Sequence, residues 1–379
     1  MTNRERLKLC LSGKLPDCVP VAPDFSNMVP ARLTGKPFWQ LYLYNDPPIW
    51  EAYIEAAKYF NIDSLMDNYF PLRFADELAG KPPWQPYIVF KNQERIITQN
   101  SYVDNGKRVW AHTANVYYVA DSPTWDVPLA KLELPAEPKW YEPVEGIKPV
   151  DHGPKGMKRI KQLMGDQGLV GTYVASSNGL ENVEAIYEYY DHPELHEKWA
   201  QQRVEACERR FANIMAMAPD ERPDFLCVGD SGSLIFQTVE IFRQLSLPAV
   251  KRGIELATAA GLPTHVHCCG PETAMVKIMA EETDLTVIDP LEIPPMGDCN
   301  LAELKKLYGK KLTLKGNLHT TEVMLRGTVD TVVAAAKQAI DDAAEGGRFI
   351  LSTGDQVGRD TPFENLRAMI EVARTYGKY

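Results

Sequence analysis

The sequence predicts an α/β protein built as a (β/α)8 (TIM) barrel that carries a small antiparallel β insertion. Short apolar runs recur through the second half of the 379-residue chain, and amphipathic segments with apolar residues at helical spacing separate them. A long β-rich stretch interrupts this rhythm in the first half of the chain. Continuous short apolar runs that alternate with helices are typical of buried parallel strands joined by crossover helices.

Eight candidate strands can be placed in order along the chain. They are the apolar runs at 19–21, 64–66, 169–174, 225–228, 264–267, 285–288, 312–314 and 349–351. Eight parallel strands close a barrel of roughly 250 residues, so we interpret residues 1–379 as a single barrel domain. A doubly wound open sheet is the alternative, although neither GxGxxG nor GxxxxGK[ST] is present to support a nucleotide-binding version of it.

The insertion is predicted at residues 80–155, between the second and third candidate strands. Residues 95–99 and 108–119 are β-rich, and they flank Asp104-Asn105-Gly106, a strong signal for a hairpin turn. The insertion could cover a pocket or present a docking surface, or it could be a structural extension. It also contains four tryptophans, which could serve the same roles or be ordinary packing: Trp84, Trp110, Trp125 and Trp140.

Composition narrows the classes of partner. The net charge of −10 argues against a nucleic-acid-binding protein, because phosphates are held mainly by Lys and Arg, and weakly against docking on anionic membranes. No run of 18 apolar residues and no signal peptide is found, so we expect no membrane span. The seven cysteines are scattered and odd in number, which indicates reduced thiols and a cytoplasmic location.

The densest chemical signal is the stretch THVHCCG at 264–270. Strand side chains alternate between faces, so His265, His267 and Cys269 are expected on one face, with Cys268 pointing away. Imidazole nitrogen and thiolate sulfur are ligands that zinc prefers, and a pair with one distant ligand would leave a coordination position open. The candidates for that distant ligand are Asp355, Asp230 and Glu292. The alternative is a buried strand that is merely rich in histidine and cysteine.

Barrel enzymes place their active sites at the carboxyl ends of the strands. Polar groups follow every candidate strand, among them Asp24, Asp67 and Asp289. From these ends we predict a set of catalytic residues, which comprises Asp230, His319 and Glu181. We predict a second set that binds substrate, which comprises Tyr173, Asn178 and Asn317.

Motifs along nearly the whole chain carry a family resemblance. They are RERL at 4–7, DCVPV at 17–21, VGDSG at 228–232, HCCG at 267–270, PPMGD at 294–298, KGNL at 315–318, FILSTG at 349–354 and TPFEN at 361–365. In this order and spacing the chain resembles the uroporphyrinogen decarboxylase superfamily, and within it the corrinoid-linked methyltransferase branch. The resemblance implies a (β/α)8 barrel.

The two branches of that superfamily imply different substrates. The decarboxylases resemble one another in an arginine-rich N-terminal segment, whereas the matching residues 24–32 contain one arginine, so a polycarboxylate would be poorly held. The methyltransferase branch uses zinc held by His-x-Cys and a later cysteine. His267 and Cys269 match the first two positions, and Asp355 occupies the third. His265 or Glu292 could complete the site instead.

The resemblance implies a function that we state as a hypothesis. The protein is expected to be a zinc-dependent methyltransferase, the O-demethylase component that moves a methyl group from a small methoxylated, aromatic substrate to cobalamin carried by a partner corrinoid protein. One alternative is a decarboxylase that acts on a carboxylated substrate without metal. A second alternative is a non-catalytic ligand-binding or carrier-docking protein, which the change at Asp355 could suggest.

Overall fold

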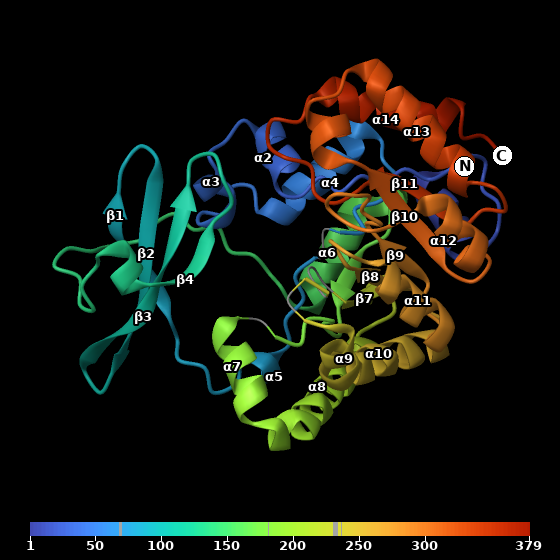
Figure 1. Ribbon diagram of the computed structural model, residues 1–379. Helices are drawn as coiled ribbons and strands as arrows, with labels where there is room; N and C mark the ends of the chain where they lie inside the picture. The colour runs from blue at the N-terminus through green and yellow to red at the C-terminus, as the bar shows by residue number, and fades with distance from the viewer. Residues whose placement is uncertain (68–69, 181, 230–233, 236) are drawn as a thin grey trace. The chain divides into compact units, whose positions relative to one another are not determined.

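The chain forms two compact units in the computed structural model (Figure 1). The model covers residues 1–379 and describes all of them except 68–69, 181, 230–233 and 236. The first unit contains residues 1–26, 57–72 and 157–379, and the second contains residues 27–56 and 73–156. The second unit therefore interrupts the first twice along the sequence.

A six-stranded parallel sheet forms the centre of the first unit. The strands lie in their sequence order from β6 to β11, and each pairs with its sequence neighbours within the sheet. The strands are β6 Gly171–Tyr173, β7 Phe225–Gly229, β8 Thr264–His267, β9 Val287–Asp289, β10 Thr313–Leu318 and β11 Phe349–Thr353. Each overlaps one of the last six apolar runs, which confirms the mixed α/β fold and its parallel sheet.

Helices separate the strands in sequence and cover the sheet. α10 packs against β7 and β8, and α13 packs against β10 and β11 (Figure 1). The helices of this unit are α1 Asn3–Leu11, α7 Val183–Asp191, α8 His196–Ala216, α9 Val239–Ile241, α10 Leu247–Ala259, α11 Thr273–Glu282, α12 Leu301–Tyr308, α13 Val329–Ala343 and α14 Phe363–Thr375. Short 3-10 or π turns are η2 Gly165–Gln167, η3 Pro193–Leu195, η4 Phe242–Ser246 and η5 Thr320–Leu325.

Two further helices cross the boundaries between the units, namely α4 Ile49–Phe60 and α6 Pro154–Met164. Throughout the described residues, no helix combines the length and the apolar character that crossing a membrane requires.

The first two predicted strands, at 19–21 and 64–66, are not strands in the structure. Val21 makes one parallel bridge to Leu351 of β11. The Leu351 N–H donates to the Pro20 carbonyl and the Ala22 N–H donates to the Leu351 carbonyl, both at 2.9 Å. The ladder goes no further on the other side, because Pro20 has no N–H and the Val21 N–H donates to the Asp63 carboxylate at 2.6 Å. The six described strands do not close on themselves, so the closed eight-stranded barrel stays a prediction.

Helix α1 covers the amino ends of the strands. Arg4 donates to the carbonyl of Gly168 at 2.8 Å and to the Asp224 carboxylate at 2.7 Å, and these two residues lie shortly before β6 and β7. Leu7 is fully buried in one apolar cluster with Phe225 of β7. Because α1 occupies this end, a site can be built at the opposite, carboxyl ends of the strands.

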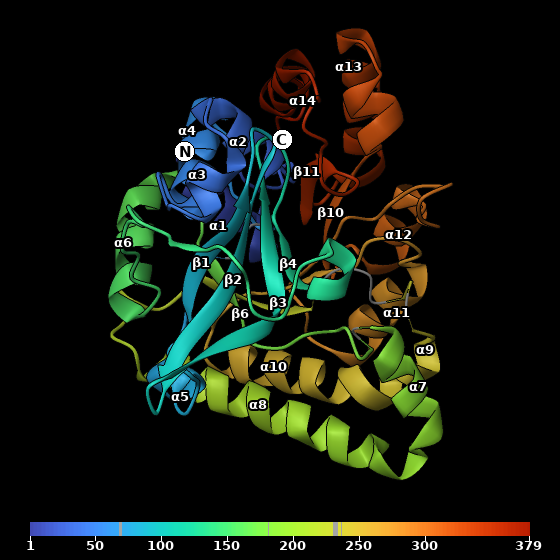
Figure 2. The ribbon, with the colours of Figure 1, turned by 90° about the vertical axis from the view of Figure 1, so that its left-hand side faces the viewer.

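The second unit contains a five-stranded antiparallel sheet in the order β4-β3-β2-β1-β5; its first four strands are seen side by side in Figure 2. The strands are β1 Gln85–Lys91, β2 Arg95–Asp104, β3 Lys107–Tyr118, β4 Thr124–Pro128 and β5 Glu142–Pro143. Asn105 and Gly106 join β2 to β3 with φ values of 49° and 80°, which is the predicted hairpin turn. The unit's short helices are α2 Met28–Thr34, α3 Phe38–Tyr42, α5 Ala75–Leu78 and η1 Leu129–Leu132.

Candidate metal centre and adjoining cavity

The stretch at 264–270 begins as β8, a central strand between β7 and β9. The side chains of His265 and His267 are buried, and both contact the carboxylate of Asp289, the last residue of β9. His265 Nε2 lies 2.9 Å and His267 Nδ1 lies 3.1 Å from Asp289 Oδ1. The two imidazoles therefore share one face of the sheet, as the period-two alternation predicts.

His267, Cys269 and Asp355 come together at the carboxyl end of the sheet. Their ligand atoms all lie within 4.8 Å of one another, and His267 Nε2 is 3.6 Å from Asp355 Oδ1. Asp355 has a φ of 103°, in the left-handed region that favours glycine, so its backbone is strained where its carboxylate approaches the histidine. The predicted triad is therefore assembled in space.

This donor set fits a zinc ion. Imidazole nitrogen, thiolate sulfur and carboxylate oxygen are all zinc ligands. Asp289 accepts a hydrogen bond from His267 Nδ1, so a neutral imidazole keeps its lone pair on Nε2. His267 Nε2 is buried and has no hydrogen-bond partner among the described residues, which suits an atom that binds a metal.

Protons compete with a metal at this histidine. Burial by itself would lower the pKa of His267, but the charge of Asp289 and its hydrogen bond to the ring raise it well above its usual range, and the neighbouring Asp67 adds to the rise. The same negative surroundings favour any cation, so a zinc ion would replace the proton on Nε2.

The other candidates for the third ligand have different partners. His265 points its Nε2 to Asp289, and Glu292 accepts a hydrogen bond from the Gly270 N–H at 2.5 Å. Within the described part of the chain, the donor group that contains both His267 and Cys269 is completed by Asp355.

A buried lysine that the sequence analysis did not single out lies beneath this group. Lys315 of β10 is fully buried, and its Nζ lies 2.6 Å from Asp67 Oδ2 and also contacts Asp289 Oδ2. Burial alone would raise the pKa of Asp289, but Lys315, His265 and His267 lower it well below its usual range. The available signal was a lysine directly after the predicted strand at 312–314.

Asp24 and Asp67 add unpaired acceptors beside His267. Asp24 Oδ1 accepts the Ser26 N–H at 2.7 Å, whereas Asp24 Oδ2 and Asp67 Oδ1 are buried without a hydrogen-bond partner in the described residues. Burial and the neighbouring charge of Asp67 raise the pKa of Asp24 to about 8. Asp24, Asp67 and His267 form a second group of possible ligands within 4.8 Å.

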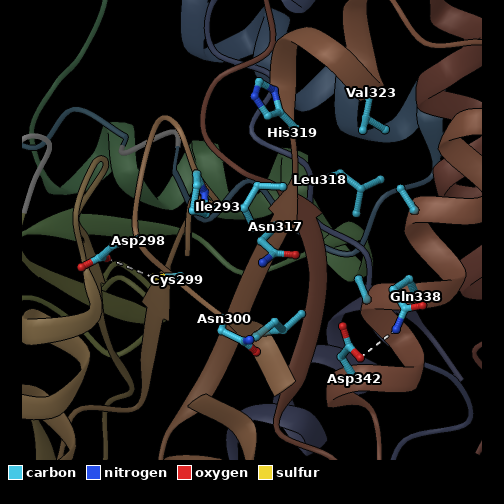
Figure 3. A pocket seen from close by; sticks show the side chains of 14 residues that line it. Ile293, Asp298, Cys299, Asn300, Asn317, Leu318, His319, Val323, Gln338 and Asp342 are labelled. Atoms are coloured by element: carbon cyan, nitrogen blue, oxygen red, sulfur yellow. Dashed lines mark hydrogen bonds between the residues drawn. The ribbon is translucent and has the colours of Figure 1, made fainter. Parts of the chain in front are cut away.

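A cavity of about 450 Å³ lies beside β10, lined by residues from β10, η5, α12, α13 and the loop after β9 (Figure 3). Much of its wall is apolar, with Ile293 and Leu318 among its residues. Its polar wall residues include Asn317 and His319, and Gln338 donates to Asp342 across its lower side in the view of Figure 3. The volume is sufficient for a small substrate with one ring.

Two predicted site residues therefore lie on the cavity wall. Asn317 donates from Nδ2 to the Leu291 carbonyl at 3.2 Å. His319 Nδ1 accepts from the N–H groups of Thr321 and Glu322 at 3.1 and 3.2 Å, so its neutral ring carries the proton on Nε2. Glu292 lies within the electrostatic influence of both groups. Burial and the charge of Asp355 raise the pKa of its carboxyl, whereas His267 and His319 lower it, with a net rise.

Two further predicted residues, Tyr173 and Asn178, are not in the metal group. Tyr173 ends β6 half-buried, and Asn178 Oδ1 accepts the Leu180 N–H at 3.3 Å. Asp230 and Glu181 lie outside the described residues.

Comparison with protein families decides the family question. The model of the uroporphyrinogen decarboxylase (URO-D) family matches residues 172–376, more than half of the chain. The chain belongs to this family. The matched region contains the strands β7 to β11, all but the first residue of β6, and the whole group of His267, Cys269 and Asp355. The resemblance inferred from the sequence motifs is thereby confirmed.

Similar proteins indicate the branch. The methylcobamide:CoM methyltransferase MtaA of Methanosarcina barkeri is 28% identical over 169 residues, which cover 44% of this chain and 45% of that protein. MtbA of Methanosarcina mazei, also a methylcobamide:CoM methyltransferase, is 28% identical over 137 residues, which cover 36% of this chain and 37% of MtbA. The chain thus spans less than half the length of these curated relatives. They support the corrinoid-dependent methyltransferase branch.

A solved methyltransferase structure from Methanosarcina mazei covers 99% of both chains with a TM-score of 0.59 and 17% identity. At this identity the likeness shows a shared fold.

Proposed function

We propose that the protein is a zinc-dependent methyltransferase that moves a methyl group from a methoxylated, aromatic donor to the cob(I)alamin of a corrinoid protein. The observation that carries this proposal is the group of His267, Cys269 and Asp355, whose ligand atoms lie within 4.8 Å. Similarity to methylcobamide:CoM methyltransferases supports a corrinoid protein as the partner.

His267 Nε2, Cys269 Sγ and a carboxylate oxygen of Asp355 would hold the zinc ion. When bound, zinc supplies Lewis acidity toward the ether oxygen that leaves with the aromatic ring. The carboxylate of Asp355, at a position where the family resemblance implies a cysteine, makes the donor set harder. A harder set favours an oxygen-bearing substrate over a thiol.

Residues of this chain would orient both the metal-binding histidine and the substrate. Asp289 holds the His267 ring through Nδ1. The cavity beside β10 offers apolar walls for an aromatic ring, and the His319 Nε2–H and the Asn317 side chain can bind polar substituents. The catalytic and substrate-binding roles of Asp230, Glu181, Tyr173 and Asn178 belong to the same proposal.

Transfer in the opposite direction is a second candidate. The two curated relatives are methylcobamide:CoM methyltransferases, which favours transfer from a methylated corrinoid to a thiol. The same three ligands would serve, with the thiol sulfur in place of the ether oxygen at the open coordination position.

The test compares both directions in one assay series. Zinc-loaded protein is mixed with cob(I)alamin and a methoxyphenol, or with methylcobalamin and a thiol, and the corrinoid spectrum is followed. We expect methyl transfer from the ether, a loss on the order of 100-fold in His267→Ala, and little change in Cys268→Ala, the matched control at the neighbouring cysteine.

If methyl transfer is seen only from methylcobalamin to the thiol, the second candidate function holds and the ether is not the donor. Absence of both reactions, or decarboxylation of a carboxylated substrate that survives chelation, would overturn the methyltransferase proposal.

A further inference from the structure

We propose that Lys315 is a positioning residue of the metal site: its ammonium fixes Asp289, and Asp289 in turn holds His267 so that Nε2 faces the metal. The inference deepens the proposed function and rests on its zinc site. Lys315 is no metal ligand itself, so its effect passes through Asp289.

The contacts of Lys315 are with carboxylates. Its side chain is fully buried, and its Nζ lies 2.6 Å from Asp67 Oδ2 and contacts Asp289 Oδ2. Asp67 is 5% exposed and Asp289 is fully buried, so water does little to screen these pairs. A buried ammonium is retained only where such partners compensate the loss of its hydration.

The two oxygens of Asp289 have separate partners. Oδ2 contacts Lys315, while Oδ1 lies within hydrogen-bond distance of His265 Nε2 and His267 Nδ1. Holding Oδ2 in place fixes the plane of the carboxylate and therefore the position of Oδ1. A continuous chain of contacts thus runs from Lys315 through Asp289 to His267, whose opposite ring nitrogen belongs to the candidate zinc site.

Removing the ammonium would leave Asp289 with an uncompensated buried charge. Such a carboxylate is unfavourable, so it is expected to shift toward other donors, and the His267 ring would shift with it. A carboxylate that accepts from a metal-binding histidine typically affects metal affinity by about 10- to 100-fold. An effect of this size is expected when Lys315 is replaced.

A purely structural lysine is the competing explanation, and the chain contains a matched control. Lys305 of α12 is partly buried, and its Nζ contacts the carbonyl of Gly347 rather than a carboxylate. Lys305→Met removes a partly buried ammonium whose contact is not with a metal-ligand candidate, so it is expected to lower stability without changing zinc affinity.

The experiment measures zinc affinity of the whole chain by competition with a chromophoric chelator. Lys315→Met is expected to weaken zinc binding by about 10- to 100-fold, and Lys305→Met to leave it unchanged. In a double-mutant cycle, Lys315→Met is expected to add less than about threefold once Asp289→Asn is present, because both act on the same contact. Far-ultraviolet circular dichroism verifies that each variant is folded.

Unchanged zinc affinity in folded Lys315→Met would overturn the inference, and so would multiplicative effects of the two substitutions. If Lys315→Met does not fold, Asp289→Asn is compared with Asp63→Asn, which changes a buried carboxylate outside the groups of possible ligands. Weaker zinc binding in Asp289→Asn with unchanged zinc binding in Asp63→Asn supports the chain of contacts, and equal effects contradict it. If the wild-type protein does not bind zinc, the proposed function itself is contradicted.

Discussion

Two clusters of buried charge in the first unit differ in how completely their polar atoms are paired. The arginine cluster consists of Arg6, Asp63 and Arg374, and its carboxylate is fully buried. Asp63 Oδ1 accepts from Arg6 Nη1 at 2.7 Å. Asp63 Oδ2 accepts from the Val21 N–H at 2.6 Å and lies 2.8 Å from Arg374 Nη1. Both carboxylate oxygens therefore have partners.

The histidine cluster is incompletely paired. We define it as five buried residues, Asp24, His265, His267, Asp289 and Lys315, together with Asp67, whose side chain is 5% exposed. Its buried atoms without a hydrogen-bond partner in the described residues are Asp24 Oδ2, Asp67 Oδ1 and His267 Nε2.

The difference is the one expected between a cluster that only stabilises the fold and a cluster that binds a ligand. A buried polar atom without a partner costs about 1–3 kcal/mol, so a fold tolerates several together where a ligand or a reaction uses them. The arginine cluster satisfies its charges within the fold. The histidine cluster keeps acceptors and a ring nitrogen available next to Cys269 and Asp355.

The largest expected effect is on stability, at the arginine cluster. Asp63→Asn leaves Arg6 and Arg374 without their shared charge, and breaking a buried pair typically costs about 3–5 kcal/mol of unfolding free energy. Urea denaturation measures this loss, and zinc affinity is expected to stay unchanged. Glu322→Gln, which breaks an exposed pair with Arg326, is the control and is expected to change little. A loss of zinc affinity in Asp63→Asn would contradict the assignment of the arginine cluster to stability alone.

A smaller effect, with a pH dependence, is expected at Asp24. Burial and the charge of Asp67 raise its pKa from the usual 3.8 to about 8, so between these pH values the metal-free folded protein holds a proton that the unfolded chain has released. The unfolding free energy of the wild type therefore falls as pH rises through this window. Asp24→Asn removes that slope.

We expect Asp24→Asn, measured after chelation, to match the wild type near pH 4 and to be more stable by about 1–3 kcal/mol at pH 8. Thermal unfolding across this pH range measures the difference. A gap that shrinks as pH rises would show that Asp24 is already ionised and paired in the folded state.

The sequence predicted the parallel sheet because its strands are continuous apolar runs, and all six described strands lie where such runs were found. It overestimated the segments at 19–21 and 64–66. The first segment makes two ladder hydrogen bonds with Leu351 of β11 but pairs no further, because the Val21 N–H donates to the Asp63 carboxylate, which apolarity alone does not reveal.

At the site, the spacing of His267 and Cys269 and the family resemblance located the ligand candidates, and the structure brings Asp355 to them. Lys315 was missed because its partners are 248 and 26 residues away in sequence. A lysine within a buried strand signals pairing with an acid, but the fold alone shows which carboxylates it meets.

The central claim is that His267, Cys269 and Asp355 bind zinc, and metal content tests it most directly. Zinc per chain is measured by mass spectrometry in protein purified without chelator. We expect about one zinc ion per chain in the wild type and in Cys268→Ala, and loss of zinc in Cys269→Ala, His267→Ala and Asp355→Ala. Wild-type protein without metal, or equal zinc in Cys268→Ala and Cys269→Ala, would contradict the account.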